Sequence, residues 1–200
     1  MRKPKSTHAS SAKRITDIMQ AALHCFTELG FNDTTMADIC GRANASTGSV
    51  YHYFKSKEQL AAAVYLEGIG KFQTGMLQVL ENEDDARRGV ISVVEYHIKW
   101  VSKNPEWSGF LFNKKILSFV SETEVELLEM NKKFITGLSL WFKHQMDTEK
   151  IRRVPWDILV AILLGPCQEY TKLYLSGKTI TKINEAANDL GIAAWNSLSK

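Results

Sequence analysis

Few residues of the kinds that mark secreted or metal-dependent proteins occur in this chain. It has three cysteines among 200 residues. An odd number of widely separated cysteines predicts buried, reduced thiols rather than a disulfide framework, with a redox role for Cys167 as the minor alternative. The five histidines and three cysteines form no C-x-x-C or H-x-x-x-H pattern, so we predict no metal site.

Long apolar runs are also missing. The longest, residues 158–164, is far shorter than the roughly 20 residues that span a bilayer. Residues 1–14 are basic and polar, without the apolar core of a signal peptide. The chain contains no nucleophile–base–acid arrangement and no phosphate-binding loop. We therefore predict a cytoplasmic protein with no membrane partner, no cofactor, no catalytic residue and no enzymatic activity.

Helical periodicity runs through almost the whole sequence, and no strand pattern or internal repeat stands out. A stripe of apolar residues from Ile15 to Leu29 predicts an amphipathic helix ending at Gly30. Farther along the chain, helical stretches are separated by breaks at Asn104–Pro105 and at Pro155. The expected later helices cover residues 57–80, 86–103, 105–119, 121–146 (with a capping box at 121–124), 155–175 and 181–198. The pattern predicts an all-α fold of about nine helices.

Residues 34–57 predict two short helices joined by a tight turn. Thr35 can cap the first helix, and Asp38 can return a hydrogen bond to it, as in a capping box. Asn44 follows the last turn, where a left-handed residue is needed, and Ser46 can cap the second helix. This is the layout of a helix-turn-helix that reads DNA in the major groove.

The second short helix has an outer side too polar and aromatic to be core alone. Val50 and Phe54 are four residues apart and face inward, while Gly48 leaves room for a phosphate backbone to approach. Ser56, with Gln59, predicts the cap of a third helix. Packing of the Tyr51–His52–Tyr53 rings on the first helix is the structural alternative to DNA contact.

Positive charge gathers on the same part of the chain. Residues 1–57 hold eight Lys and Arg against four Asp and Glu, whereas residues 58–200 hold seventeen against eighteen. A basic excess confined to the motif is the electrostatic footprint expected of a DNA-binding segment, although the excess is modest.

Residues 15–64 resemble the DNA-binding domain of the TetR/AcrR family of bacterial regulators. The matching positions are residues 15–26, Gly30-Phe31, Thr34-Thr35, Asp38-Ile39, Ala43, Ser46, Gly48-Ser49-Val50-Tyr51, Tyr53-Phe54, Ser56-Lys57-Glu58 and Leu60. The resemblance covers a quarter of the chain. It implies a helix-turn-helix domain at 10–56 and a helical effector-binding and dimerisation domain at 57–200, after a basic tail at 1–9 that its composition predicts to be disordered.

By position, the resemblance assigns DNA contacts to nine residues. Phosphate contacts fall on Tyr51, Tyr53 and Lys57. Base-edge or groove contacts fall on Met36, Ala37, Ser46, Thr47, Gly48 and His52. The family often has Lys at the position of Thr47 and a polar or basic residue near Met36 and Ala37, so direct base readout is expected to be thin there.

Aromatic residues are dense in the helices between 86 and 146, with a few polar residues among them. Core packing explains each one singly, but together they favour a pocket between the helices at 86–103, 105–119, 121–146 and 155–175. The candidate effector-binding residues are His97, Trp100, Phe110, Asn113, Phe134, Trp141 and Gln168. Such a pocket would suit a lipophilic or aromatic effector.

The helix at 155–175 is apolar on more than one face and must be buried on two sides. With the helix at 181–198, we expect it to form a two-fold four-helix interface between protomers, as the resemblance also implies. The candidate interface residues are Leu159, Leu163, Tyr170, Leu190 and Trp195.

The sequence thus predicts a homodimeric, ligand-responsive DNA-binding regulator. Repression relieved by a small effector is the favoured mode, although the family implied by the resemblance includes activators. Two alternatives remain: an architectural DNA-binding protein without an effector, and a small-molecule enzyme carrying an incidental helix-turn-helix.

Overall fold

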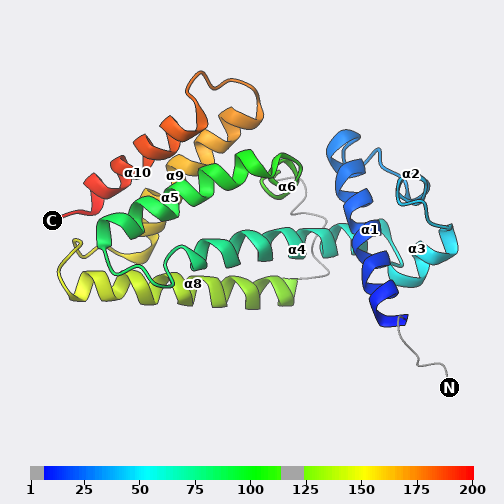
Figure 1. The fold of residues 1–200 in the computed structure, drawn as a ribbon, viewed down its shortest axis with the longest axis horizontal. Helices are drawn as coiled ribbons and strands as arrows, with labels where there is room; N and C mark the ends of the chain where they lie inside the picture. The colour runs from blue at the N-terminus through cyan, green and yellow to red at the C-terminus, as the bar shows by residue number, and fades with distance from the viewer. Residues whose placement is uncertain (1–6, 114–123) are drawn as a thin grey trace. The chain divides into compact units, whose positions relative to one another are not determined.

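The computed structural model describes residues 7–113 and 124–200. Within this part the chain is all-α, as predicted, and forms nine helices (Figure 1). They are α1 (Thr7–Glu28), α2 (Met36–Arg42), α3 (Thr47–Tyr53), α4 (Lys57–Gln78), α5 (Ala86–Lys103), α6 (Pro105–Leu111), α8 (Glu124–Asp147), α9 (Trp156–Leu175) and α10 (Ile183–Leu198).

Most predicted helix boundaries lie within two residues of the observed ones, the usual uncertainty of a fraying end. Helix α1 is one exception, because it begins at Thr7, well before the predicted stripe at Ile15. It therefore includes the last part of segment 1–9, which was expected to be disordered. Alanines near its start favour helix, and adding a residue to an existing helix costs little. The helix expected at 105–119 is corrected: α6 ends at Leu111, and residues 112 and 113 are not helical. The rest of the tail at 1–9 and the capping box expected at 121–124, save Glu124 itself, fall outside the described residues.

The chain divides into two compact units. The first comprises residues 1–68 and 109–124, and the second comprises residues 69–108 and 125–200. Helix α4 therefore contributes its first half to one unit and its second half to the other. The first unit extends past residue 57, where sequence placed a domain boundary, because Leu60, Ala61 and Val64 of α4 are fully buried.

In the first unit, α2 packs on α1 and α3 packs on α2. The core comes from the predicted apolar stripe of α1, in which Ile18, Ala22 and Leu23 are fully buried. Leu29 ends outside this core and is half exposed, because α1 ends at Glu28 and the backbone turns at Gly30 with a φ of 84°. The unit is a small scaffold that presents α2 and α3.

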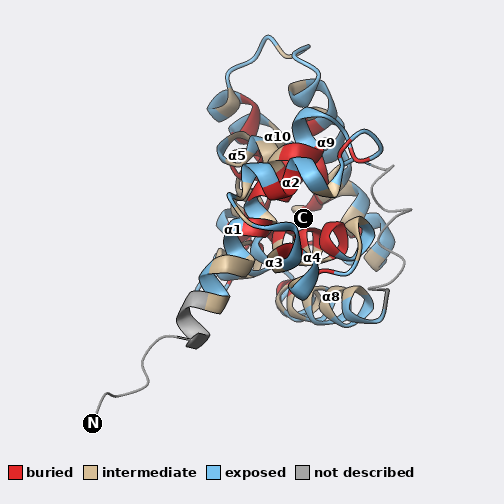
Figure 2. Ribbon diagram, turned by 90° about the vertical axis from the view of Figure 1, so that its right-hand side faces the viewer, coloured by how far each residue is buried: buried red, intermediate tan, exposed pale blue. Residues whose placement is uncertain are grey.

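In the second unit, α5 packs closely against α10 and also contacts α9. Gly191 of α10 allows this approach, since a Cβ there would lie 3.0 Å from the Ile91 side chain. Buried residues, red in Figure 2, lie along the facing sides of these helices, whereas α8 is mostly intermediate or exposed. No helix among the described residues is both long and apolar enough to cross a membrane.

Candidate nucleic-acid interface

Helix α2 begins with the predicted capping box. The Asp38 amide donates to Thr35 Oγ1 at 3.2 Å, and the Thr35 amide donates to Asp38 Oδ2 at 2.8 Å. Hydrogen bonds from the Thr35 hydroxyl and amide hold the pKa of the Asp38 carboxyl below its ordinary value. After α2 the chain turns at Asn44, whose φ of 46° confirms the predicted left-handed residue.

Helix α3 is capped by Ser46, whose Oγ accepts a hydrogen bond from the Ser49 amide at 3.2 Å. Val50 and Phe54 are buried, which confirms the predicted inner face. The opposite side of the helix is exposed. It presents Thr47, Gly48, Tyr51 and His52, and the capping residue Ser46 is exposed beside them. On α2, Ala37 is exposed and Met36 is half-buried.

Gly48 is an unusual choice for this exposed position. No heavy atom would lie within 4 Å of a Cβ built there, and its φ is not positive. A glycine inside a helix costs roughly 1 kcal/mol relative to alanine. Nothing within the described part of the chain therefore requires a glycine at this position.

The two tyrosines of α3 differ in their surroundings. The Tyr53 hydroxyl lies 3.1 Å from Ser11 Oγ of α1, and its ring packs edge-on against His52 at 4.9 Å. Tyr51 is 40% exposed. Tyr53 therefore helps to fix α3 on α1, while Tyr51 offers its ring and hydroxyl to solvent.

The turn after α3 is also capped. Ser56 Oγ accepts from the Gln59 amide at 3.0 Å, as predicted, but the Gln59 side chain accepts from the Lys55 amide at 2.6 Å, one residue before the expected partner. The Lys55 ammonium donates to the carbonyl of Tyr51 at 2.9 Å and remains on the surface. Both bonds hold the short segment between α3 and α4 in place.

Lys57 does not point to solvent as a phosphate contact would require. Its ammonium donates to the carbonyls of Phe31, Asn32 and Thr34 at 2.7, 3.2 and 2.7 Å, and lies 4.6 Å from the centre of the Phe31 ring. A lysine ammonium has three N–H donors, so these carbonyls use all of them. Lys57 ties the start of α4 to the segment between α1 and α2 in this structure, and its contact with a phosphate stays a prediction.

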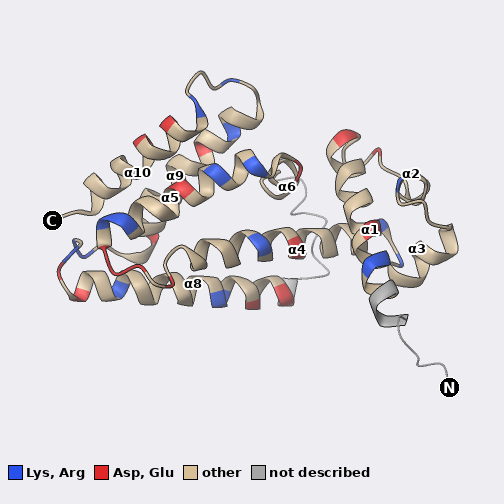
Figure 3. Cartoon of the chain, in the orientation of Figure 1, with Lys and Arg blue, Asp and Glu red and all other residues tan. Residues whose placement is uncertain are grey.

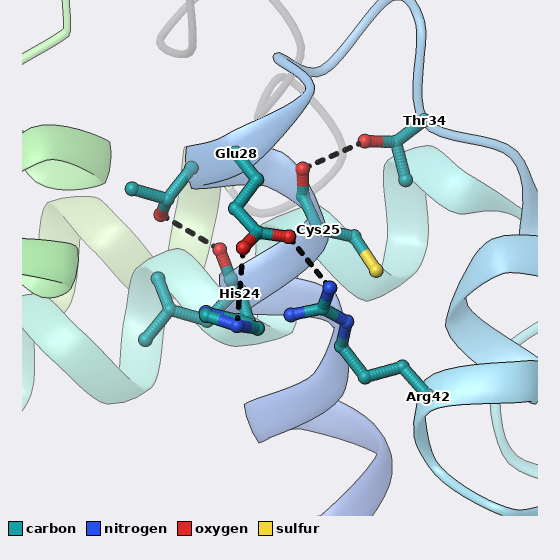
Figure 4. Close-up of polar contacts among 7 residues, drawn as sticks. His24, Cys25, Glu28, Thr34 and Arg42 are labelled. Carbon is teal, nitrogen blue, oxygen red and sulfur yellow. Dashed lines mark hydrogen bonds and ion pairs between the residues drawn. The ribbon is translucent and has the colours of Figure 1, made fainter.

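A second set of polar contacts fixes α2 on α1 (Figure 4). Glu28 of α1 accepts from Arg42 of α2 at 2.6 Å, and its other oxygen lies 3.5 Å from His24 Nε2. Beside them, the Thr34 hydroxyl donates to the Cys25 carbonyl at 3.1 Å. The Arg42 charge is therefore matched by a carboxylate within the unit rather than left for an external anion.

Figure 3 places the remaining basic residues of this unit on α1 and beside α3. Of the Lys and Arg residues described before position 58, Arg42 pairs with Glu28, and Lys55 and Lys57 donate to backbone carbonyls. Lys13, Arg42 and Lys55 are exposed, and Arg14 and Lys57 are half-buried.

The residues predicted to line an effector pocket belong to both units. His97 and Trp100 are buried in the second unit, with His97 Nε2 3.2 Å from Thr171 Oγ1. Phe110 instead belongs to the first unit, where it stacks on Phe26 at 5.6 Å. The others are scattered: Asn113 lies in the first unit, Phe134 and Trp141 are half-buried on α8, and Gln168 is exposed on α9. The composition of the effector pocket therefore stays a prediction.

Burial determines the protonation state of His97, the buried polar residue of α5. Desolvation lowers the pKa of His97 to about 4, so its imidazole is uncharged near neutral pH. Phe72 lies edge-on to this ring at 5.3 Å and to the Trp100 ring at 5.1 Å. The aromatic residues of α5 thus form packed core with α4, the structural alternative raised by the sequence.

The helices predicted to form a protomer interface present different residues from those expected. Leu159 and Leu163 are 0% and 3% exposed within the chain itself, so they are core residues and not available to a partner. Tyr170, Leu190 and Trp195 are half-buried. The outer side of α9 instead carries a mainly apolar surface, made of Ile158, Ala161, Ile162, Gly165, Pro166 and Leu173.

The three cysteines are free and buried. Burial raises the pKa of the Cys167 thiol to about 12, and its sulfur donates to the Leu163 carbonyl at 3.1 Å. A buried thiol that stays protonated reacts slowly with oxidants, which argues against the redox alternative for Cys167. No group of His, Cys, Asp and Glu suited to a metal occurs among the described residues.

The architecture and the exposed second helix of the motif define a helix-turn-helix protein of the kind that binds DNA. Comparison with known proteins agrees: residues 18–64 match the sequence profile described as "Bacterial regulatory proteins, tetR family". The helix-turn-helix segment of the chain therefore matches the TetR family. The TetR resemblance stated from sequence is confirmed.

Two curated relatives and two solved structures illustrate the likeness. The chain is 40% identical over 58 residues to the "HTH-type transcriptional repressor KstR2" of Mycolicibacterium smegmatis, covering 29% of this chain and 28% of that protein. It is 26% identical over 80 residues to the "Fatty acid metabolism regulator protein" of Bacillus subtilis, covering 40% and 41%. The matched stretches thus span less than half the length of these two relatives.

The fold is shared over nearly the whole chain. A TetR family transcription regulator from Marinobacter aquaeolei superposes with a TM-score of 0.80 at 17% identity, covering 97% of this chain and 100% of that one. FadR from Bacillus subtilis, solved in complex with stearoyl-CoA, gives 0.74 at 16% identity, covering 90% and 96%. At such identities the likeness shows the fold alone.

Proposed function

We propose that this protein is a transcriptional regulator that binds double-stranded DNA by placing α3 in the major groove. The observation that carries the proposal is the exposed, unpacked Gly48 at the start of a helix capped by Ser46. A side chain is missing where the helix would meet a DNA backbone, at a cost in helix stability that nothing in the described fold offsets. The names of the curated relatives support the same role.

The proposed contacts follow from exposure. Met36, Ala37, Ser46, Thr47 and His52 would meet base edges or groove walls beside Gly48, because they lie on α2 and α3 with their side chains exposed or half exposed. Tyr51 would donate its hydroxyl to a phosphate, with Tyr53 contributing from beside it. Lys57 would act indirectly, by holding the segment before α2.

A single short helix makes too few contacts for specific affinity, so we propose a homodimer. Its two-fold axis would relate two copies of the outer side of α9, together with the half-buried Leu190 and Trp195 of α10. A two-fold dimer would place two α3 helices about one DNA turn apart, roughly 34–36 Å, on a symmetric operator.

We further propose that a small apolar effector releases the protein from its operator and so relieves repression in the cytoplasm. Names of relatives support an apolar effector: one curated relative is a fatty acid metabolism regulator, and one structural neighbour was solved with stearoyl-CoA. An effector that binds a conformer with the wrong spacing of α3 helices lowers operator affinity by its preference for that conformer.

Replacing Gly48 with alanine tests the DNA proposal. The Gly48→Ala protein should be more stable to urea by roughly 0.5–1 kcal/mol, because alanine favours helix and the position is open. The same change should weaken DNA binding about tenfold, since roughly 1.4 kcal/mol would be lost by crowding the backbone contact. Urea unfolding and fluorescence anisotropy with a labelled duplex give the two values.

Ser49→Ala is the matched control, because Ser49 is the neighbouring, half-buried small residue of the same helix. It should leave DNA affinity within about twofold of the parent, a difference of roughly 0.4 kcal/mol. A Gly48→Ala protein that gains stability and binds DNA as tightly as the parent would remove the main support for this placement of α3.

A further inference from the structure

The part of α2 and α3 proposed to face DNA lacks the side chains that make two hydrogen bonds to one base. We call this part the reading surface; it consists of Met36, Ala37, Ser46, Thr47, Gly48, Tyr51 and His52. Arginine and lysine pair with guanine, asparagine and glutamine with adenine, and aspartate and glutamate with cytosine. None of these residue types belongs to the reading surface.

Charged side chains next to the reading surface are held by the protein itself. The Asp38 carboxylate accepts hydrogen bonds from the Thr35 amide and hydroxyl at 2.8 and 2.6 Å. The Arg42 guanidinium donates to the Glu28 carboxylate of α1 at 2.6 Å (Figure 4). The two lysines that follow α3 donate to backbone carbonyls. These groups are therefore engaged within the first unit.

The polar groups that remain select weakly among bases. Serine and threonine hydroxyls bond to more than one base, and the Ser46 hydroxyl already accepts from the Ser49 amide. The two ring nitrogens of His52 point in different directions, so this residue makes one hydrogen bond to a base edge, and its ring packs edge-on against Tyr53 at 4.9 Å. The Asn44 amide belongs to the turn and to neither helix. Hydrogen bonding therefore gives the reading surface little power to choose a sequence.

Methyl groups are what the reading surface offers instead. Ala37 is exposed in the first turn of α2, and Thr47 is exposed in the first turn of α3. Gly48, next to Thr47, has no side chain that would keep a base away from it. Of the four bases only thymine presents a methyl group in the major groove, and alanine and threonine methyl groups suit contact with it.

We propose that Ala37 and Thr47 read thymine through its C5 methyl group, so that apolar contact rather than paired hydrogen bonds selects the operator. This inference deepens the DNA-binding function proposed above and rests on it. Each contact removes about one methyl group from water. That is worth about fourfold in affinity, the factor that corresponds to roughly 0.8 kcal/mol.

Deoxyuridine tests the proposal directly, because it lacks the C5 methyl group of thymidine and pairs with adenine in the same way. A duplex that the parent protein enriches from a random pool is resynthesised with uracil at one thymine position of both half-sites at a time, and fluorescence anisotropy gives the affinity. At one or more positions the symmetric substitution should weaken binding about fifteenfold, since each half-site loses about fourfold. Uracil outside the half-sites is the control and should change affinity less than about twofold.

Two matched variants separate the methyl group of Thr47 from its hydroxyl. Thr47→Ser removes the methyl group and keeps the hydroxyl, whereas Thr47→Val keeps a methyl group and removes the hydroxyl. Thr47→Ser should bind the thymine and uracil duplexes equally at the position that Thr47 reads, and Thr47→Val should retain the preference for thymine. Ala37→Gly should abolish the preference at the position that Ala37 reads. Both residues are exposed, so these changes leave the core of the unit intact.

Two results would overturn the proposal. One is equal affinity of the parent protein for every thymine and uracil duplex. The other is a preference for thymine that persists in full in both Thr47→Ser and Ala37→Gly. A parent protein that enriches no sequence disproves the proposed regulator and this inference with it, whereas a parent that enriches sequences but ignores their thymine methyl groups disproves this inference alone.

Discussion

Replacing Ile158 and Ile162 with glutamate is expected to turn a dimer into a monomer and to lower operator affinity by at least about a hundredfold, since one half-site then binds alone. Ile158 is 44% exposed and Ile162 is half-buried on the outer side of α9. Four carboxylates gathered at a two-fold contact would be desolvated without partners, which a mainly apolar interface does not tolerate.

Sedimentation equilibrium at micromolar concentration measures the assembly state, and anisotropy with a labelled operator measures affinity. Leu128→Glu with Leu140→Glu is the matched control, because these leucines are exposed on α8, at 61% and 65%. That variant should remain a dimer and bind DNA. A dimeric Ile158/Ile162 variant, or a parent protein that sediments as a monomer, would contradict the proposed interface.

Replacing Lys57 with methionine should destabilise the first unit by about 3 kcal/mol. The change keeps the aliphatic chain and removes three hydrogen bonds from a charged donor, each worth roughly 1.5–3 kcal/mol when buried and less at a half-exposed site. Because the lost bonds fix the segment before α2, DNA affinity should fall as well. The dependence of affinity on salt should keep its slope, since no phosphate contact is lost.

Lys55→Met is the contrasting variant. The Lys55 ammonium is exposed beside α3 and donates to the Tyr51 carbonyl, so its removal should cost roughly 0.5–1 kcal/mol, less than Lys57→Met. It should lower the salt slope by about one if Lys55 neutralises a phosphate. Urea unfolding and anisotropy titrations over a salt series give both quantities. If Lys57→Met instead keeps its stability and lowers the salt slope by about one, Lys57 contacts phosphate directly, as the family resemblance implied.

Local features of the fold were predictable because they depend on neighbours in sequence. The cap at Thr35, the left-handed Asn44 and the cap at Ser46 each follow from residues three or four positions apart, and all are observed. The role of Lys57 was not predictable in this way. Its carbonyl partners lie 23 to 26 residues earlier, and only the tertiary fold brings them together.

Helix periodicity also could not decide which side of α9 faces inward. The helix is apolar nearly all round, so Leu159 and Ile158 looked equally suited to a partner protomer. The structure buries Leu159 fully and leaves Ile158 44% exposed. The choice is made by the packing of α9 on α5, which brings together residues such as His97 and Thr171, 74 positions apart in sequence.

The aromatic residues gave the least reliable signal. Their density between residues 86 and 146 suggested one pocket, but Phe110 stacks on Phe26 while Trp100 packs on Phe72. Aromatic rings fill cores as readily as they line pockets.

Selection of bound sequences from a pool of random DNA duplexes tests the central claim most directly, because it requires no knowledge of the operator. If paired α3 helices enter successive major grooves, the enriched duplexes will contain two half-sites related by two-fold symmetry, with centres about 10–10.5 base pairs or a multiple of that apart. Failure of the parent protein to enrich any sequence, or enrichment of a single unpaired half-site, would contradict the account.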